Sequence, residues 1–493
     1  MLLIMVVSLY TSRIVLNTLG VEDYGIYSIV GGVIVLFSFF HNAMSIATQR
    51  FLTYEIGRND HSKLKHTFSM SINVHLGIGF LILLLGETVG LWFLNTQLKI
   101  PFERMVAANW LYQFTIINFL INILKVPYHS TIIAYEKMSF FAYLSIIEAV
   151  LKLTIVFLIQ ITVFDRLVSY GFLLVVVSFL IFISYKTYCN RNYDISHYSF
   201  IWDSKLFKSL INFSGWTLFG SSANIGSLQG TNILINIFHG VTVNAAMGIA
   251  NQVNGTINGF VQNFQTAYQP QIVKSYAIGD KEYLSQLIFQ TSKFSFFLLY
   301  ILALPILFNM EMILELWLKN VPPYAVEFCS LIIFYSLIET ISFPMIMTVY
   351  ASGEIKNYQL ITSFIILSNL WISYVFLKLG YEPSIVLLVR IFTNGVLFLY
   401  RFWYVRKLIS LSIIHYFRKV IRFILLVIGA SLVIPIIIIK NNETLIMFFL
   451  SLVVTFLSVI LSVYFLGLNR KEKHYLRSVI MKMLNRIYNT SER

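Results

Sequence analysis

The sequence predicts an all-α, polytopic membrane protein with about fourteen transmembrane helices, built as two six-helix lobes in a parallel internal repeat plus an extra helix pair. Three observations lead to this fold class. The chain of 493 residues is 58% hydrophobic and only 12% charged. Its mean hydropathy is +0.76, and apolar stretches long enough to cross a bilayer recur along its whole length. Its second half also resembles its first when displaced by about 220 residues.

The apolar stretches define the expected spans in order. They are centred on about residues 10, 37, 80, 116, 151, 176, 221, 256, 300, 338, 367, 393, 430 and 455, with boundaries uncertain by a few residues. The opening stretch MLLIMVVSLY lacks the basic segment and the small-residue cleavage site of a signal peptide. We therefore expect it to be the first span.

The positive charge alternates between the connections. Of the 36 Lys and Arg residues, 25 belong to one alternate set of connections and the tail, and six belong to the other set. The positive-inside rule then places both termini in the cytoplasm, which requires an even number of spans. Because the basic residues are scattered over many loops, nucleic-acid binding does not explain the net charge of +14. The tail KEKHYLRSVIMKMLNRIY has the spacing of a basic amphipathic helix on the inner leaflet.

The internal repeat brings matching residues beside the same connections. LNTLGVEDYG aligns with INIFHGVTVNA, which pairs Gly20 with Gly240, and YEIGRND aligns with YAIGDKE. Trp92 pairs with Trp317 further on. Six spans in each copy give both copies the same orientation, so they are related about an axis along the membrane normal. The expected parts are an N-lobe (1–190), a cytoplasmic link (191–208), a C-lobe (209–406), two extra helices (407–467) and the basic tail (468–493).

One expected span carries an unusual number of amides. The stretch GIANQVNGTINGFVQNFQTAYQP has no formal charge. Six of its amides share one helical face: Asn251, Asn254, Asn258, Gln262, Gln265 and Gln269. Its repeat partner, the second span, has polar residues at matching positions: Ser38, Asn42, Ser45 and Gln49. Such residues can simply pack helices together, and Gly255 and Gly259 form a GxxxG pattern. Since packing needs fewer amides, we favour two polar stripes that line a hydrated cavity between the lobes.

Several charged residues lie within the expected spans, where burial costs about 2.5–3.5 kcal/mol on insertion scales. Lys152 follows Glu148 by one helical turn, so the two are expected to pair. Lys293, near an inner helix end, is expected to snorkel to the interface. Three residues have no acid nearby and are the best candidates to contact an anionic substrate: Arg13, Lys125 and Arg390. The expected substrate site comprises these three together with Lys152 and Glu148.

The sequence carries no motif of an enzyme or a metal site. P-loop, HExxH and GxSxG patterns do not occur, and the nine histidines are scattered. Cys189 and Cys329 lie far apart and form no motif. We therefore expect no cofactor, no metal and no enzymatic activity. Transport would draw on an ion gradient or on the gradient of the substrate itself.

Three stretches resemble a known family. LYTSRIVLNTLGVEDYGIYSIVGGV, AMSIATQRFLTYEIG and IIAYEKMSFFAYLSIIEAVLKL resemble the bacterial polysaccharide flippases of the multidrug/oligosaccharidyl-lipid/polysaccharide exporter superfamily, and the similarity covers nearly the whole chain. The resemblance implies translocation of undecaprenyl-diphosphate-linked oligosaccharide units across the cytoplasmic (inner) membrane, for surface polysaccharides such as the O-antigen of lipopolysaccharide. Related flippases of lipid-linked precursors rely on cavity arginines, so the resemblance also implies that Arg13 contacts the diphosphate.

The expected partners are the lipid-linked oligosaccharide, membrane lipid, a coupling proton or sodium ion, and polysaccharide polymerase and glycosyltransferases. Three alternatives stay open. A cation-coupled multidrug exporter of the same fold would carry a clear intramembrane acid, and Glu339 is the only obvious one besides the paired Glu148. A membrane polysaccharide polymerase would need a large external loop with basic residues, whereas these external loops are short. A purely structural scaffold would not need two polar stripes.

Overall fold

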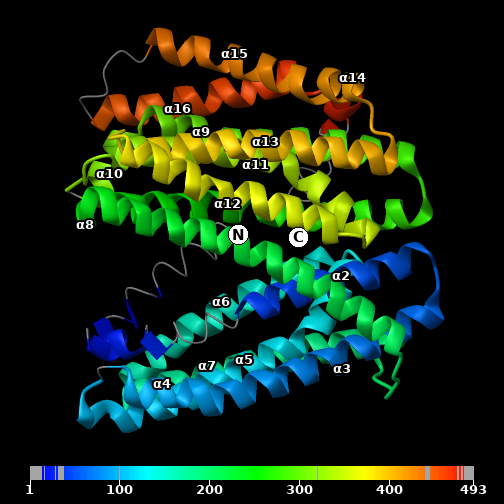
Figure 1. The fold of residues 1–493 in the computed structure, drawn as a ribbon, viewed down its shortest axis with the longest axis vertical. Helices are drawn as coiled ribbons and strands as arrows, with labels where there is room; N and C mark the ends of the chain where they lie inside the picture. Colours follow the sequence, from blue (N-terminus) through cyan, green and yellow to red (C-terminus); the bar gives the residue numbers. More distant parts are fainter. Residues whose placement is uncertain are drawn as a thin grey trace, which may run out of the picture. The chain divides into compact units, whose positions relative to one another are not determined.

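The computed structural model describes residues 11, 14–15, 17–20, 22–27, 29–30, 38–98, 100–318, 320–438, 445–474, 477–478 and 481. Every regular element in these ranges is a helix (Figure 1), so the predicted all-α fold is confirmed. Eleven of the described helices are long and apolar enough to cross a membrane. The protein is therefore a multi-pass membrane protein.

The helices follow the expected spans closely. The longest is α8, Ser204–Ile278, which holds the expected spans at 221 and 256 and leaves helical geometry at Gly240. The other ten helices each hold one expected span. The expected second span is α2, Ser38–Gly57, whereas most of the expected first span lies outside the described residues.

The repeat is visible in the order and bounds of the helices. The first copy contains α3 (His61–Leu85), the π-helical turn η1 (Gly86–Gly90), α4 (Leu91–Thr96), α5 (Met105–Ala134), α6 (Met138–Gln160) and α7 (Arg166–Asn192). The second copy contains α9 (Lys281–Phe308), α10 (Met310–Leu318), α11 (Ala325–Ser352), α12 (Lys356–Lys378) and α13 (Ile385–Ile409) in the same order. Gly20 and Gly240, paired in the alignment, both have left-handed backbone, with φ of 82° and 80°. Glycine adopts this conformation without a steric penalty, which explains why it stands at both turns.

An extra helix pair follows the second copy. It begins with the short helix α14 (Ile413–Tyr416) and the π-helical turn η4 (Phe417–Ile421), and continues with α15 (Arg422–Ile438), α16 (Leu445–Ser462) and the π-helical turn η5 (Val463–Gly467). Helix α16 packs against both α15 and α9. The tail is helical at 470–474, and most of the predicted amphipathic tail helix lies outside the described residues.

Aspartates begin several helices. Asp60 accepts from the backbone N–H of Lys63 at the start of α3, and Asp165 accepts from Leu167 and Val168 at the start of α7. Asp203 does the same for α8, with the N–H groups of residues 205 and 206. These carboxylates satisfy N–H groups that have no partner inside the helix, and their charge favours a helix N-terminus.

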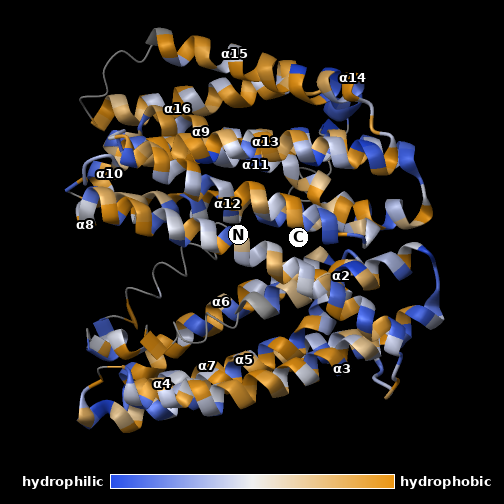
Figure 2. Cartoon of the chain, in the orientation of Figure 1, coloured by the Kyte–Doolittle hydropathy of each residue, from blue (hydrophilic) through white to orange (hydrophobic). Residues whose placement is uncertain are grey.

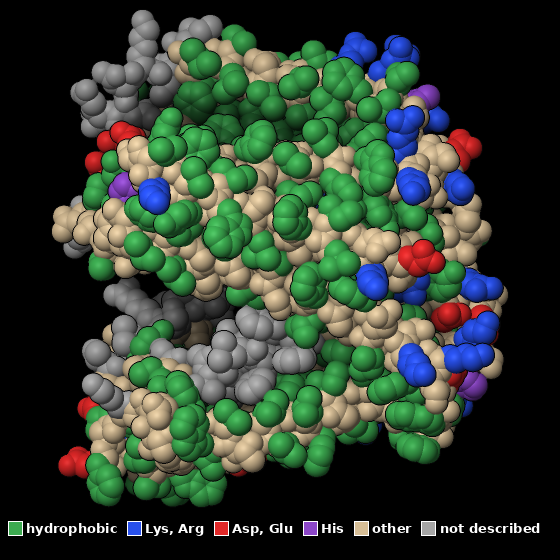
Figure 3. Space-filling view, viewed as in Figure 1, with side chains coloured by type: hydrophobic (Ala, Val, Ile, Leu, Met, Phe, Trp, Pro, Cys, Tyr) green, Lys and Arg blue, Asp and Glu red, His purple; other side chains and the backbone are tan. Residues whose placement is uncertain are grey.

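The chain divides into two compact units. The first comprises residues 1–225, 266–280 and 347–363, and the second comprises 226–265, 281–346 and 364–493. In the first unit α5 packs closely against α7 and also against α2 and α3. Its apolar core includes Leu52, Phe68, Ile132 and Val156. Helix interiors are apolar and their ends hydrophilic (Figure 2). Lys and Arg side chains gather at the α2–α3 turn of the first unit and around α14 of the second (Figure 3).

Candidate functional site

A cavity of about 600 Å³ lies within the first unit. Its walls come from the described part of the N-terminal segment and from α5, α6 and α7. Most of the lining side chains are polar: Thr11, Tyr24, Tyr27, Asn118, Asn122, Ser145, Glu148, Lys152, Tyr170 and Ser178. Polar side chains at the depth of a membrane require water, protein or a ligand as partner. This cavity is therefore the best candidate for a binding site in the first unit.

The two charged residues that line the cavity, Glu148 and Lys152, both come from α6, and a lysine of the neighbouring α5 interacts with them. Lys152 Nζ of α6 donates to Glu148 Oε1 at 2.6 Å, which confirms the expected pair. Lys125 of α5 interacts electrostatically with both residues. Three of the five predicted substrate-site residues are thus close together. Two ammonium groups against one carboxylate leave the cluster with a net positive charge, which favours an anionic ligand.

Neutral groups fill much of the remaining wall. Asn122 Nδ2 donates to the Asn118 carbonyl at 2.8 Å, one helical turn away on α5. The rings of Tyr27 and Tyr170 meet edge to face at 5.2 Å. Hydroxyl and amide groups can both donate and accept, and tyrosine adds an apolar ring. Such a wall suits a ligand rich in hydroxyl groups.

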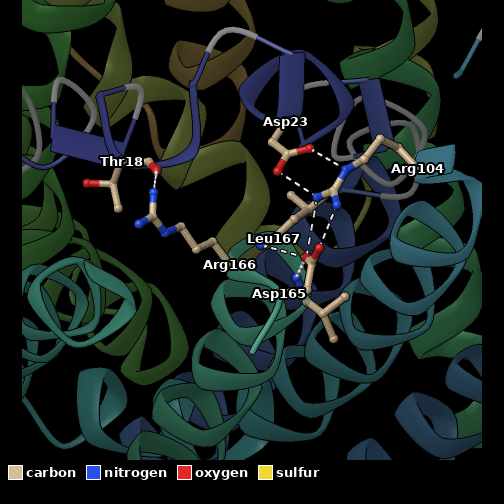
Figure 4. Close-up of polar contacts among 7 residues, drawn as sticks. Thr18, Asp23, Arg104, Asp165, Arg166 and Leu167 are labelled. Carbon is tan, nitrogen blue, oxygen red and sulfur yellow. Dashed lines mark hydrogen bonds and ion pairs between the residues drawn. The ribbon is translucent and has the colours of Figure 1, made fainter. Parts of the chain in front are cut away.

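An ion-pair cluster at one end of the first unit positions three of these walls (Figure 4). Arg104 Nε and Nη2 bond the Asp23 carboxylate at 2.8 and 2.6 Å, and its Nη1 bonds Asp165 at 2.5 Å. Asp23 adjoins Tyr24, Arg104 adjoins the start of α5, and Asp165 caps α7. Burial acts to raise the pKa of the Asp165 carboxyl, but donation from Arg104 and from the N–H groups of α7 outweighs it and lowers this pKa below its ordinary value. Arg104 therefore ties together three segments of the cavity wall.

A second group of contacts closes the opposite end of the first unit, and we call it the closure cluster: Arg50, Glu136, Lys274 and Ala351. Arg50 of α2 is buried and its Nη2 donates to the Ala351 carbonyl of α11 at 2.8 Å. Lys274 of α8 donates to Glu136, which follows α5, at 2.6 Å. These bonds join the N-terminal helices to segments more than 100 residues later in the chain.

Close packing reinforces the closure cluster. The Arg50 guanidinium lies 4.6 Å from the Phe51 ring and 4.7 Å from the Tyr54 ring. A Cβ atom on Gly57 would come within 2.9 Å of the Lys274 Cα. Gly353 has a φ of 82°, and a Cβ there would meet Arg50 at 2.8 Å. The closure thus depends on two close backbone approaches and on one buried arginine. Arg50 is one of the 25 basic residues that the charge pattern assigned to the cytoplasmic connections, and its aromatic neighbours in QRFLTY were a usable signal of its buried position.

The remaining predicted charges lie elsewhere. Arg13 is outside the described residues. Arg390 of α13 belongs to the second unit, where its guanidinium lies 4.3 Å from the Tyr335 ring. Its Nη1 is buried and has no hydrogen-bond partner among the described residues. Lys293 differs from expectation: it does not snorkel, because its side chain is 3% exposed and bonds Glu472 at 2.8 Å.

The amide stripe of α8 is divided between the two units. Asn254 accepts hydrogen bonds from Asn258 at 2.8 Å and from Ser336 of α11 at 2.5 Å. Asn251 donates to Asn232 at 3.4 Å. The packing alternative also predicts hydrogen bonds of this kind, and the hydrated cavity along this stripe stays a prediction. Gln262 is exposed, whereas Gln265 and Gln269 are buried.

The matching polar residues of α2 are placed as follows. Asn42 is exposed, Ser45 is half-buried and Gln49 is buried. Gln49 Nε2 has no hydrogen-bond partner in the described part of the chain. The side chain of Ser38 lies outside the described residues. Within the described ranges, no group of three His, Cys, Asp or Glu side chains could hold a metal ion.

Comparison with known proteins identifies the fold. No protein-family model matches the chain, and no curated protein matches it in sequence. Among solved structures, a MATE protein in a straight conformation aligns over 83% of this chain and 92% of its own, with a TM-score of 0.71 and 14% identity. An outward-facing multidrug resistance MATE transporter of the MOP superfamily aligns over 82% and 92%, with a TM-score of 0.71 and 13% identity. A MOP superfamily transporter from Pyrococcus furiosus, described as having a binding pocket of reverse polarity that suggests a different function, aligns over 83% and 93%, with a TM-score of 0.69 and 13% identity. The chain therefore has a MATE-like fold.

Proposed function

We propose that the protein is a flippase that moves a polyprenyl-diphosphate-linked oligosaccharide across the bacterial cytoplasmic membrane by alternating access. The observation that carries this proposal is the chemistry of the first-unit cavity. Lys152 and Glu148 line this cavity among amides, hydroxyls and tyrosine rings, and Lys125 of α5 adds a second positive charge that interacts with Glu148. The ammonium groups suit an anionic diphosphate, and the neutral wall suits the sugars.

The fold supports a transporter but does not select its substrate. Multidrug transporters share this fold, and so does the Pyrococcus protein whose pocket polarity is described as reversed. The charge of the binding pocket, and not the fold, therefore has to distinguish one substrate class from another. A hydroxyl-rich pocket beside the net positive cluster of Lys125, Lys152 and Glu148 favours a glycolipid anion over a lipophilic cation.

The closure cluster supports alternating access. Arg50 and Lys274 join segments that are distant in the chain through one hydrogen bond to a carbonyl and one half-buried ion pair. Contacts of this kind are few enough to break and re-form as a transporter opens and closes. The protein would act without catalytic chemistry, coupled to a proton, a sodium ion or the substrate gradient, with both termini in the cytoplasm. Glycosyltransferases would supply its substrate and a polymerase would consume it.

A cation-coupled multidrug exporter is the second candidate. One observation favours it: the Glu148 side chain is 30% exposed and lines the cavity. If Lys152 moved away, this carboxylate would bind a cation or a proton. The two candidates therefore differ in which partner of the Lys152–Glu148 pair contacts the substrate.

Reconstitution distinguishes the two candidates. Full-length protein is placed in vesicles that contain undecaprenyl-diphosphate oligosaccharide, and a membrane-impermeant glycosidase reports which leaflet holds the sugar. We expect the wild type to move the glycolipid. Lys152→Met should lower the rate roughly ten- to one-hundred-fold, as loss of a charge-assisted hydrogen bond predicts, and Lys152→Arg should keep part of the rate.

The matched control is Lys65→Met, which removes an exposed lysine of α3 and should leave transport unchanged. Absence of glycolipid movement by the wild type, together with gradient-driven export of a cationic dye that Glu148→Gln abolishes, would replace the flippase with the exporter.

A further inference from the structure

A second cavity, of about 430 Å³, lies in the second unit at the junction of α9 with the extra helix pair. Phe289 and Lys293 come from α9, Lys419 from η4 and Phe423 from the start of α15. The segment that follows η5 adds Asn469, Lys471 and Glu472. The cavity therefore brings together three lysines from three separate segments of the chain.

The single acid of this cavity is fully occupied. Glu472 accepts from Lys293 Nζ with both carboxylate oxygens, at 2.9 and 2.8 Å. It also accepts from the Asn469 N–H at 2.8 Å, while its own N–H donates to Asn469 Oδ1. The side chains of Lys293 and Glu472 are 3% and 10% exposed. Glu472 thus neutralises Lys293 and has no charge left for another cation.

The other two lysines are exposed and make no ion pair with any described residue. Lys419 lies 5.4 Å from the Phe289 ring, and Lys471 lies beside Glu472 at the cavity edge. The cavity consequently carries two uncompensated positive charges above an aromatic floor. Ammonium groups of lysine are common ligands of phosphate oxygens.

The surroundings of the cavity are those of a membrane interface. It lies where α9 and α15 begin and α16 ends, so polar residues give way there to apolar helix surface (Figure 2). Large apolar side chains of α15, of the end of α16 and of η5 stay exposed: Leu425, Leu426, Leu461 and Phe465. The acyl chains of a lipid whose phosphate entered the cavity would contact this apolar surface, whereas a soluble anion would not cover it.

We propose that this cavity binds the phosphate headgroup of an anionic membrane lipid, held by Lys419 and Lys471 over the Phe289 and Phe423 rings. The buried Lys293–Glu472 pair holds the tail segment in place, so that Lys471 faces Lys419 across the cavity. The lipid joins the extra helix pair to α9. This assignment does not depend on which substrate the protein transports.

The test uses purified full-length protein that has been stripped of lipid in detergent. Binding of phosphatidylglycerol with brominated acyl chains is followed by quenching of the intrinsic tryptophan and tyrosine fluorescence. Phosphatidylcholine serves as the zwitterionic comparison and sodium phosphate as the soluble one. We expect saturable binding of phosphatidylglycerol that exceeds that of phosphatidylcholine, and no displacement by millimolar phosphate.

The double variant Lys419→Gln/Lys471→Gln should weaken phosphatidylglycerol binding roughly 25-fold, at about five-fold for each lysine near an anionic lipid. Lys205→Gln/Lys208→Gln, which removes two exposed lysines at the start of α8, is the matched control and should bind as the wild type does. Both double variants change exposed side chains, and unfolding temperature and gel filtration verify their folding. Equal affinity of the cavity variant and the wild type would overturn the site. Displacement of the lipid by millimolar phosphate would overturn the lipid as its ligand and assign a soluble phosphate.

Discussion

Arg50 offers the most direct test of the closure cluster, because a single side chain makes most of its contacts. The arginine is 7% exposed, donates one hydrogen bond to the Ala351 carbonyl and lies against two aromatic rings. We consider Arg50→Ala, which removes all of these contacts, and Arg50→Lys, which keeps the charge but loses the planar guanidinium.

The size of the effect follows from these contacts. A hydrogen bond from a charged donor contributes about 1.5–3 kcal/mol, and each cation–π contact about 0.5–1 kcal/mol. Burial of the Arg50 Nε without a partner among the described residues offsets part of this gain. A net loss of about 2 kcal/mol in Arg50→Ala corresponds to a change of roughly 30-fold in the ratio of closed to open molecules.

Spin labels at His61→Cys and Ile278→Cys report this ratio by double electron–electron resonance. Both positions are exposed, belong to the first unit and flank the closure cluster. The native cysteines, Cys189 and Cys329, are buried. We expect Arg50→Ala to shift the distance distribution toward longer separations and Arg50→Lys to shift it less.

The control is Arg58→Ala, which removes an exposed arginine just beyond the end of α2. It should leave the distances unchanged. If Arg50→Ala folds normally and keeps the wild-type distance distribution, Arg50 does not hold the closure. If the variant only unfolds at a lower temperature without a distance shift, its role is packing.

Three further outcomes are expected. Lys293→Met should lower the free energy of unfolding by about 3–5 kcal/mol, since it leaves Glu472 buried without its partner. Chemical denaturation measures this loss, and the double variant Lys293→Met/Glu472→Leu should recover most of it. An unchanged free energy of unfolding in Lys293→Met would contradict the prediction. The depressed pKa of Asp165 contributes stability that is present above the ordinary Asp pKa of about 3.9 and is lost as the pH falls through the lower native value. The unfolding temperature of the wild type should therefore fall more steeply below about pH 4 than that of Asp165→Asn, and parallel curves would contradict this. Impermeant thiol labelling of intact cells should reach a cysteine after Leu98 but not one after Asp60, and labelling of the C-terminal tail from outside would refute the topology.

The fold was accessible from the sequence because its causes are local. An apolar run determines a single membrane-spanning helix, and a glycine determines a single turn. The helices and the shared backbone geometry of Gly20 and Gly240 could therefore be predicted from the local pattern of residues. The Glu148–Lys152 pair was accessible for the same reason, since its members are one helical turn apart.

The contacts that hold the closure cluster and the second-unit cavity together could not be predicted from local sequence patterns. Arg50 and Ala351 are 301 residues apart, and Lys293 and Glu472 are 179 residues apart. No periodicity connects such residues, so only the folded structure shows that they are partners. The tyrosines of the cavity were missed because an aromatic residue in a span carries no signal of the direction in which it points.

The two halves of the repeat share the order of their helices but differ in the charged side chains at corresponding positions. Helix α6 begins at Met138 and α12 at Lys356. With the helix starts aligned, Glu148 and Lys152 correspond to Ile366 and Leu370.

The same comparison of α7 with α13 pairs Gly171 with Arg390. Each half therefore carries charged groups that the other lacks at these positions: the Lys152–Glu148 pair of the cavity in the first unit, and an arginine against Tyr335 in the second. The two halves therefore cannot provide two chemically equivalent binding sites. Under the proposed flippase function, the charged diphosphate and the neutral sugars of the substrate would need different side chains, and the two halves carry different ones.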